Sequence, residues 1–329
     1  MPKPKIAIVS ASGCHACETT MLDIHYGVNA LNRWAEIRFW PFVLGSSMAD
    51  LEKIDRLDVC FFSGAIATEA DRAMAEILRE KCDRLVAVGA CAAYGGMPGL
   101  KNLKKRATAE AADDGDPPEG LTLPKQENRI RALEGVDGVD RVDAVVPGCP
   151  APLNLVWAAV SALVCGGEAD ARITYTAARL PEEMVRPILS GLGPPTGAVF
   201  AGEKAVCASC SRKKEEKRFK AVKRPYQAYE STGRCLLEQG LICQGIATRE
   251  GCGGLCTGVG VPCRGCYGKP PATFDPGAKM VSAISSTFET EKPAEIQKIA
   301  DDFVDMTGCF YRYTLPTQCM LMGGNVNSE

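Results

Sequence analysis

Cysteine is the residue type that most constrains this chain. The sequence of 329 residues contains 17 cysteines but only two histidines, His15 and His25. A secreted disulfide scaffold is usually short and follows a signal peptide, whereas clustered thiols in a reducing compartment are more often metal ligands or redox groups. Because imidazole is so scarce here, the available ligands are nearly all thiolates, which suit iron–sulfur clusters and all-cysteine zinc sites.

Short apolar segments alternate with helical segments through the first half of the chain. We predict strands over 5–11, 37–44, 57–66, 84–91 and 142–149, and helices over 21–31, 28–35, 68–82 and 154–165. Nearly continuous apolar strands separated by helices are typical of a buried parallel sheet. The predicted fold class is therefore α/β, with a flavodoxin-like doubly wound parallel sheet in the first part of the chain.

Cysteines follow three of the predicted strands. Cys14 and Cys17 lie in SGCHAC, Cys91 in GACAAYGG and Cys149 in VPGCPAP. Ligands of open parallel sheets bind at the carboxyl ends of the strands, so these four thiols share one edge of the sheet. Four converging thiolates are the ligand set of a four-iron cluster. The alternatives are buried structural thiols or a structural zinc site, although zinc ligands usually come in tight local pairs.

Eight further cysteines lie within 60 residues of the second half, in a segment with little regular secondary structure. Such a segment buries little apolar surface, so another interaction must hold it together. Two four-thiolate clusters would do so, and two four-cysteine zinc ribbons are the alternative. We assign Cys207, Cys210, Cys235 and Cys243 to one set and Cys252, Cys256, Cys263 and Cys266 to the other.

The remaining five cysteines are not expected to be ligands. They are Cys60, Cys82, Cys165, Cys309 and Cys319, of which Cys60 and Cys165 lie in apolar runs and are predicted to be core residues. A connector rich in proline and glycine separates the two groups of ligand cysteines. We therefore predict two domains, a flavodoxin-like domain over 1–180 and a loop-rich iron–sulfur domain over 181–329.

Charge and hydropathy exclude several classes of protein. The net charge of −2 provides no basic surface for nucleic acid or anionic lipid. No apolar run approaches the roughly 18 residues of a membrane-spanning helix. The N-terminal residues run directly into a strand, with no secretory or twin-arginine pattern, so we expect a cytoplasmic protein.

The cysteine motifs resemble those of a known family. SGCHACE, GACAAYGGMPG and VPGCPAP match, in order, the proximal-cluster motifs of nickel–iron hydrogenase small subunits. RCLLEQGLICQGIATREGCGGLC and PCRGCYG resemble more narrowly the cytoplasmic, archaeal-type small subunits of methyl-viologen-reducing (coenzyme-non-reducing) hydrogenases associated with heterodisulfide reductase. The similarity extends from Lys5 to about Pro271.

This resemblance implies that the chain transfers electrons and contains no catalytic residue. Three 4Fe-4S clusters are implied: a proximal one on the four strand-end cysteines, a medial one on the set from Cys252 to Cys266, and a distal one on the set from Cys207 to Cys243. In membrane-bound and periplasmic relatives, one cluster ligand is a histidine and the middle cluster has three irons. Here Cys207 stands in place of that histidine, and Cys256 supplies a fourth thiol to the middle cluster.

The resemblance also implies two partners. One is a large subunit that holds the nickel–iron centre and oxidises H2. The other is an iron–sulfur or flavin subunit that accepts the electrons, such as a heterodisulfide reductase module. Two alternatives remain at this point: the small subunit of a deazaflavin-coenzyme-reducing hydrogenase, and a zinc-stabilised binding module on an α/β domain.

Overall fold

The computed structural model divides the chain into two compact units. Unit 1 comprises Met1–Phe200 and Tyr313–Glu329, and unit 2 comprises Ala201–Arg312. The predicted boundary between residues 180 and 181 lies outside the described residues and stays a prediction. The structure describes residues 3–23, 28–103, 126–136, 138–164, 194–215, 219–227, 229–289, 292, 294, 297, 301, 303 and 305–318.

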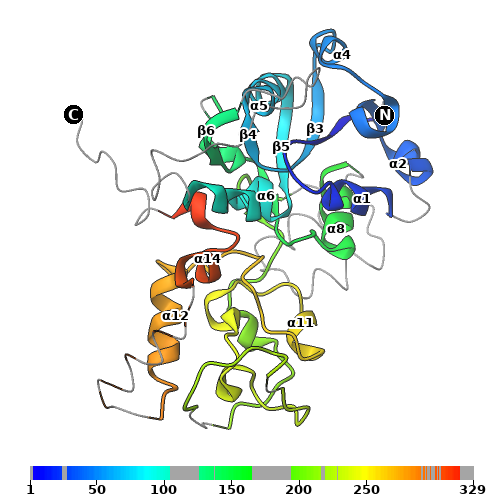
Figure 1. The fold of residues 1–329 in the computed structure, drawn as a ribbon. Coiled ribbons are helices and arrows are strands. Elements are labelled where there is room, and N and C mark those ends of the chain that lie inside the picture. The colour runs from blue at the N-terminus through cyan, green and yellow to red at the C-terminus, as the bar shows by residue number, and fades with distance from the viewer. Residues whose placement is uncertain are drawn as a thin grey trace. The chain divides into compact units, whose positions relative to one another are not determined.

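A parallel sheet forms the centre of unit 1 (Figure 1). Among the described residues it has six strands in the order β2-β1-β3-β5-β7-β8, and every neighbouring pair is parallel. The order changes direction between β1 and β3, which is where ligands bind in flavodoxin-like sheets. The predicted α/β, doubly wound class is confirmed. The strands are β1 (Lys5–Ser10), β2 (Glu36–Phe39), β3 (Leu57–Ser63), β5 (Cys82–Val88), β7 (Ala144–Val146) and β8 (Ala198–Val199).

The predicted strand over 37–44 is shorter in the structure. It ends at Phe39, and α3 (Pro41–Leu44) follows after a single residue. Pro41 occupies the first turn of that helix, where its fixed φ is suitable and its missing N–H costs nothing. In a strand the same residue would remove a donor from the ladder, so the apolar run changes from strand to helix at this point.

The predicted strand over 57–66 separates into two strands in different sheets. After β3 the chain turns at Gly64, whose φ is 84°, and continues as β4 (Ile66–Thr68). A Cβ on Gly64 would come within 2.6 Å of the Ala11 backbone, so only glycine fits this turn. β4 then pairs antiparallel with β6 (Gln126–Arg131). Neither this small sheet nor β8 was predicted from the sequence.

Three helices of unit 1, those predicted over 28–35, 68–82 and 154–165, begin within one residue of their predicted positions. The helix predicted over 21–31 was wrong, because α1 spans Ala16–Leu22 and residue 23 lies in a turn. At the start of α5, the Thr68 hydroxyl accepts a hydrogen bond from the Asp71 amide, and the Asp71 carboxylate accepts one from the Thr68 amide. The last long helix, α8, is apolar almost all round and is correspondingly buried. The helical elements are α1 (Ala16–Leu22), α2 (Val28–Trp34), α4 (Met48–Glu52), α5 (Glu69–Lys81), α6 (Gly89–Tyr94), α8 (Leu153–Val164), and the 3-10 helices η1 (Met97–Leu100), η2 (Leu133–Gly135) and η6 (Leu315–Thr317).

Two cysteines belong to the hydrophobic core of unit 1. Cys60 is fully buried on β3, which confirms its predicted core position, and Cys82 is 4% exposed at the start of β5. Burial raises the pKa of the Cys60 thiol well above its ordinary value and raises that of Cys82 to about 12. Both thiols therefore pack as small apolar groups. Cys165 and Cys319 lie outside the described residues.

Unit 2 consists mainly of loops and short helices, as the sequence predicted for the second part of the chain. Its longest described helix, α12, packs against η5 and α14 through a small apolar cluster that includes Met280 and Phe310. A second cluster contains Cys243 and Cys263, so thiols supply part of the interior. The elements are η3 (Val206–Ala208), η4 (Leu237–Gln239), η5 (Gln244–Ala247), α11 (Leu255–Gly258), α12 (Pro276–Ser285) and α14 (Met306–Phe310).

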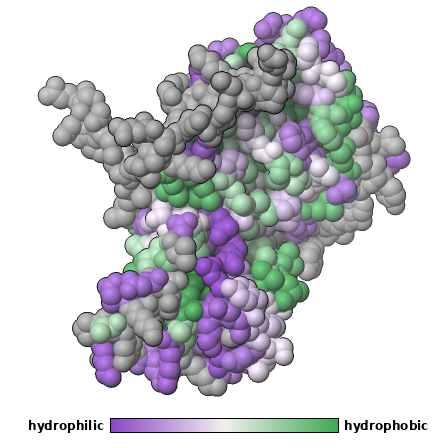
Figure 2. All heavy atoms as spheres, viewed as in Figure 1, coloured by the Kyte–Doolittle hydropathy of each residue, from purple (hydrophilic) through white to green (hydrophobic). Residues whose placement is uncertain are grey.

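The surface carries both polar and apolar residues. On the face shown in Figure 2, hydrophilic residues cover much of the described part of unit 2, and apolar residues gather beside α11, where Leu255 and Val259 are exposed. No helix in the part of the chain that the structure describes has the length and apolar character needed to cross a membrane.

Candidate metal centres

Four thiols from three strand ends meet in unit 1. Cys14 lies in the turn after β1, Cys17 in the first turn of α1, Cys91 in α6 after β5, and Cys149 after β7. They lie close enough that Cys17 and Cys149 both act electrostatically on Cys91, as does Cys14. The parallel sheet therefore brings together the four residues that the sequence selected, although up to 135 positions separate them.

Burial and mutual repulsion raise the pKa of three of these thiols, those of Cys17, Cys91 and Cys149. Burial raises the pKa of Cys17 to about 11 and that of Cys91 to about 12, and the neighbouring cysteines raise both further. The pKa of Cys149 is raised in the same way, first by burial and then by Cys14. A metal ion has the opposite effect, since a coordinated thiol loses its proton.

The backbone around these sulfurs leaves space that only glycine allows. A Cβ on Gly89 would stand 2.3 Å from Cys17 Sγ, and a Cβ on Gly96 would stand 2.5 Å from Cys91 Sγ. Both glycines have positive φ, 86° and 57°. The Ala151 amide donates a hydrogen bond to Cys17 Sγ at 3.4 Å. Close backbone approach and amide donation to sulfur are what a thiolate-bound cluster requires, so the residues fit such a group.

The C-terminal return of the chain contributes a residue that the sequence analysis did not select. The Tyr313 side chain hydrogen-bonds to the sulfur of Cys149 and thereby lowers the pKa of that thiol, against the larger effect of burial. The Tyr313 carbonyl also accepts a hydrogen bond from the Gly96 amide at 3.1 Å. No spacing pattern in the sequence links residue 313 to the strand ends.

The same return explains two further glycines of the GGMPG motif. A Cβ on Gly95 would come within 2.3 Å of Pro316, and a Cβ on Gly99 within 2.4 Å of it. Gly96, between them, faces Cys91. The motif therefore accommodates a thiol on one side and the η6 segment on the other.

A buried carboxylate lies beside the first CxxC motif. Glu18 is 2% exposed in the first turn of α1, where a carboxylate is favoured by the helix dipole. One of its oxygens accepts a hydrogen bond from Trp40 Nε1 at 2.8 Å, and the other lies 3.1 Å from His15 Nδ1. His15 adopts the left-handed conformation at φ 58° and is about half exposed. Each oxygen of the Glu18 carboxylate therefore has a side-chain partner, Trp40 for one and His15 for the other.

Unit 2 brings its cysteines together in one region. Cys207 is influenced electrostatically by Cys235 and Cys210, and also by Cys263, while Cys263 is influenced by Cys252 and Cys256. The two predicted sets therefore adjoin, and the division of the eight thiols between them stays a prediction. Burial is the main cause of the raised thiol pKa values, which reach about 11 at Cys207 and about 12 at Cys243.

The two sets meet where Cys243 approaches Cys263. The Cys263 amide donates a hydrogen bond to Cys243 Sγ at 3.3 Å. Gly245 faces the first set, since its Cβ would lie 3.2 Å from Cys207 Sγ and 3.8 Å from Cys243 Sγ. Threonine hydroxyls accompany both sets: Thr257 Oγ1 lies 3.2 Å from Cys210 Sγ, and Thr248 Oγ1 lies 3.5 Å from Cys263 Sγ.

The remaining ligand candidates lie near α11 and after it. Cys256 is exposed within α11, and Cys252 and Cys266 are partly buried. Across the described residues, no group of three or more His, Cys, Asp or Glu side chains is spaced to hold a single metal ion.

Comparison with known proteins places this arrangement in a family. The family model described as NADH ubiquinone oxidoreductase, 20 Kd subunit, matches residues 14–163. An F420-non-reducing hydrogenase subunit from Methanothermobacter thermautotrophicus is 33% identical over 334 residues, which cover 97% of each chain. This chain belongs to the family of F420-non-reducing hydrogenase subunits. It is accordingly a small subunit of the coenzyme-non-reducing type of nickel–iron hydrogenase, as its cysteine motifs predicted.

Two other matches extend over most of the chain. The F420-non-reducing hydrogenase iron-sulfur subunit of Archaeoglobus profundus is 29% identical, over 95% of this chain and 96% of that protein. A solved actinobacterial-type NiFe-hydrogenase from Ralstonia eutropha H16 aligns with 92% of this chain and 90% of that chain, at 15% identity and a TM-score of 0.48. The family assignment disfavours both alternatives from the sequence analysis, the deazaflavin-coenzyme-reducing type and the zinc-stabilised binding module.

Proposed function

We propose that this chain is the electron-transferring subunit of its hydrogenase and holds three 4Fe-4S clusters. The proximal cluster is bound by Cys14, Cys17, Cys91 and Cys149. The medial cluster is bound by Cys252, Cys256, Cys263 and Cys266, and the distal cluster by Cys207, Cys210, Cys235 and Cys243. Electrons from H2 oxidation in a large subunit, which contains the nickel–iron centre, pass through these clusters to an iron–sulfur or flavin partner, such as a heterodisulfide reductase module.

One observation carries this proposal. Four thiols from three separate strand ends converge at one edge of the sheet. Beside them lie glycines at which an added Cβ would collide with a cysteine sulfur. Simple packing of apolar cysteines would require neither the glycines nor the amide donor at Cys17. An iron–sulfur subunit name among the relatives supports the same cofactor.

When bound, the clusters supply one-electron transfer, and the residues of the chain determine how readily each cluster accepts an electron. Thiolates hold the iron, while burial and hydrogen bonds to sulfur tune the potential. Near the proximal set, the Ala151 amide and the Tyr313 side chain point to Cys17 and Cys149, respectively. Donors to a cluster sulfur favour the more negative reduced state, so these contacts raise the potential of the proximal cluster.

The proposal is tested by the metal content and the partners of the protein. The chain is expressed together with the large subunit and the electron-accepting partner. The complex is purified without oxygen through an affinity tag on this chain. We expect about twelve irons and a similar amount of sulfide per polypeptide on the four-ligand rule, with broad absorption into the blue. Nickel is expected in a co-purifying large subunit. A colourless preparation containing stoichiometric zinc would contradict the cluster assignment.

Two substitutions provide a matched comparison. Cys91→Ala removes a proposed proximal ligand, and we expect the loss of about four irons. Cys60→Ala removes a thiol from the core of the same sheet, and iron content is expected to stay unchanged. Equal iron loss in both variants would show that damage to the fold, rather than loss of a ligand, explains the result.

A further inference from the structure

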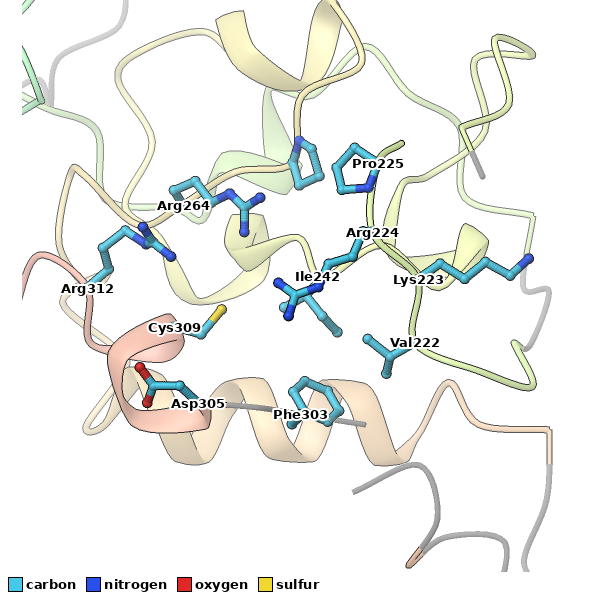
Figure 3. A pocket seen from close by; sticks show the side chains of 11 residues that line it. Val222, Lys223, Arg224, Pro225, Ile242, Arg264, Phe303, Asp305, Cys309 and Arg312 are labelled. Carbon is cyan, nitrogen blue, oxygen red and sulfur yellow. The ribbon is translucent and has the colours of Figure 1, made fainter. Parts of the chain in front are cut away.

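A small cavity in unit 2 is lined by an unusual concentration of positive charge. Its volume is about 200 Å³. Figure 3 shows the guanidinium groups of Arg224, Arg264 and Arg312 turned toward the same space, while the Lys223 side chain points away. The three arginines come from separate loops, so the fold rather than a local motif brings them together. The other lining residues include Ile242 and Asp305.

Within the part of the chain that the structure describes, these guanidinium groups have no acidic partner at ion-pair distance. Asp305 is the one carboxylate among the lining residues, and it accepts a hydrogen bond from the Gly308 amide at 2.7 Å as the N-cap of α14. Arg312 Nε is buried and has no hydrogen-bond partner. A buried donor without a partner is costly, and like charges that line one space repel, so an anion bound in the cavity would offset both effects.

We propose that this cavity binds a small phosphate-type oxyanion. Guanidinium groups bind phosphate oxygens through paired, charge-assisted hydrogen bonds, and three of them around one space match a tetrahedral anion. The cavity is smaller than the roughly 300–1,000 Å³ typical of sites for drug-sized ligands, which favours inorganic phosphate or pyrophosphate over a whole nucleotide. Ile242, which is 9% exposed, forms an apolar wall of the cavity.

The site uses none of the twelve proposed cluster ligands, so its test is independent of the iron content. The anaerobically purified hydrogenase complex is titrated calorimetrically with inorganic phosphate, and separately with pyrophosphate, at ionic strength held constant with chloride. We expect saturable binding of one anion per small subunit. Arg224→Gln is expected to weaken binding about tenfold, the effect of losing one charge-assisted contact.

Lys279→Gln provides the control, because it removes the same charge from an exposed position on α12 that does not line the cavity. Its binding is expected to equal that of the unaltered complex. Arg264→Gln removes a second guanidinium group from the cavity and is expected to weaken anion binding as much as Arg224→Gln. The proposal is overturned if neither anion gives saturable heat, or if Arg224→Gln and Lys279→Gln titrate alike.

Discussion

Gly89 and Cys17 lie so close together that a Cβ on the glycine would stand 2.3 Å from the cysteine sulfur. The two residues belong to different strand–helix turns, one after β5 and one after β1. The backbone at the end of β5 leaves space for the sulfur of Cys17, which follows β1. The order of the strands in the sheet therefore determines which thiols can meet.

Gly89→Ala is therefore expected to disrupt the proximal cluster. The added methyl group displaces the Cys17 sulfur, and the positive φ of 86° adds backbone strain. We expect the loss of about four irons per chain, measured by iron and sulfide analysis of the anaerobic protein. Gly45→Ala is the control: its φ is 66°, but nothing lies within 4 Å of the added Cβ. Comparable iron loss in the control would assign the effect to strain alone.

Cys256 is expected to determine the iron count of the medial cluster. Cys256→Ala leaves three thiolates in the proposed set, which can retain a three-iron cluster. We predict the loss of about one iron and a new electron paramagnetic resonance signal from an oxidised three-iron centre. Cys309→Ala, which removes a thiol outside both sets, is expected to change neither quantity. Loss of the whole medial cluster in Cys256→Ala would contradict this prediction, because it would show that three thiolates do not retain a three-iron cluster here.

Arg264 is expected to raise the potential of the medial cluster, because it lies between the proposed ligands Cys263 and Cys266. A positive charge stabilises the more negative reduced cluster, so Arg264→Gln lowers the potential. A redox titration followed by electron paramagnetic resonance measures this shift. Arg264→Lys keeps the charge and should shift less; an upward shift in Arg264→Gln contradicts the argument.

Cys60 is expected to make the protein sensitive to alkaline pH. Burial raises its pKa in the folded state well above its ordinary value, whereas unfolding returns the thiol to an ordinary pKa of about 8.5. Above that pH the unfolded state releases a proton that the folded state retains. The thiol's contribution to stability, complete below pH 8.5, therefore declines as pH rises, by up to about 1.4 kcal/mol per pH unit.

Melting temperatures measured anaerobically between pH 8 and pH 10.5 test this dependence. Cys60→Ala is expected to melt lower at neutral pH, since it leaves a small cavity, but to lose less stability with rising pH. Parallel curves for the two proteins would show that Cys60 does not carry the alkaline effect.

The predicted sheet was recovered because its signal is local. Strand and helix segments are defined by runs of apolar residues, and the parallel arrangement then places every strand end at one edge. Two errors occurred where a local feature interrupted such a run. Pro41 turned the end of one predicted strand into a helix, and Gly64 redirected another into a separate sheet.

The sequence alone determined which residues are proposed to bind metal, because thiol chemistry and the spacing of the cysteine motifs are properties of the chain itself. Only the tertiary structure decided what surrounds them. Tyr313 contacts Cys149 through a C-terminal return, and Arg224 and Arg312 reach one cavity from loops far apart in sequence. Such contacts follow from how irregular loops pack, and no periodic pattern of residues encodes that packing.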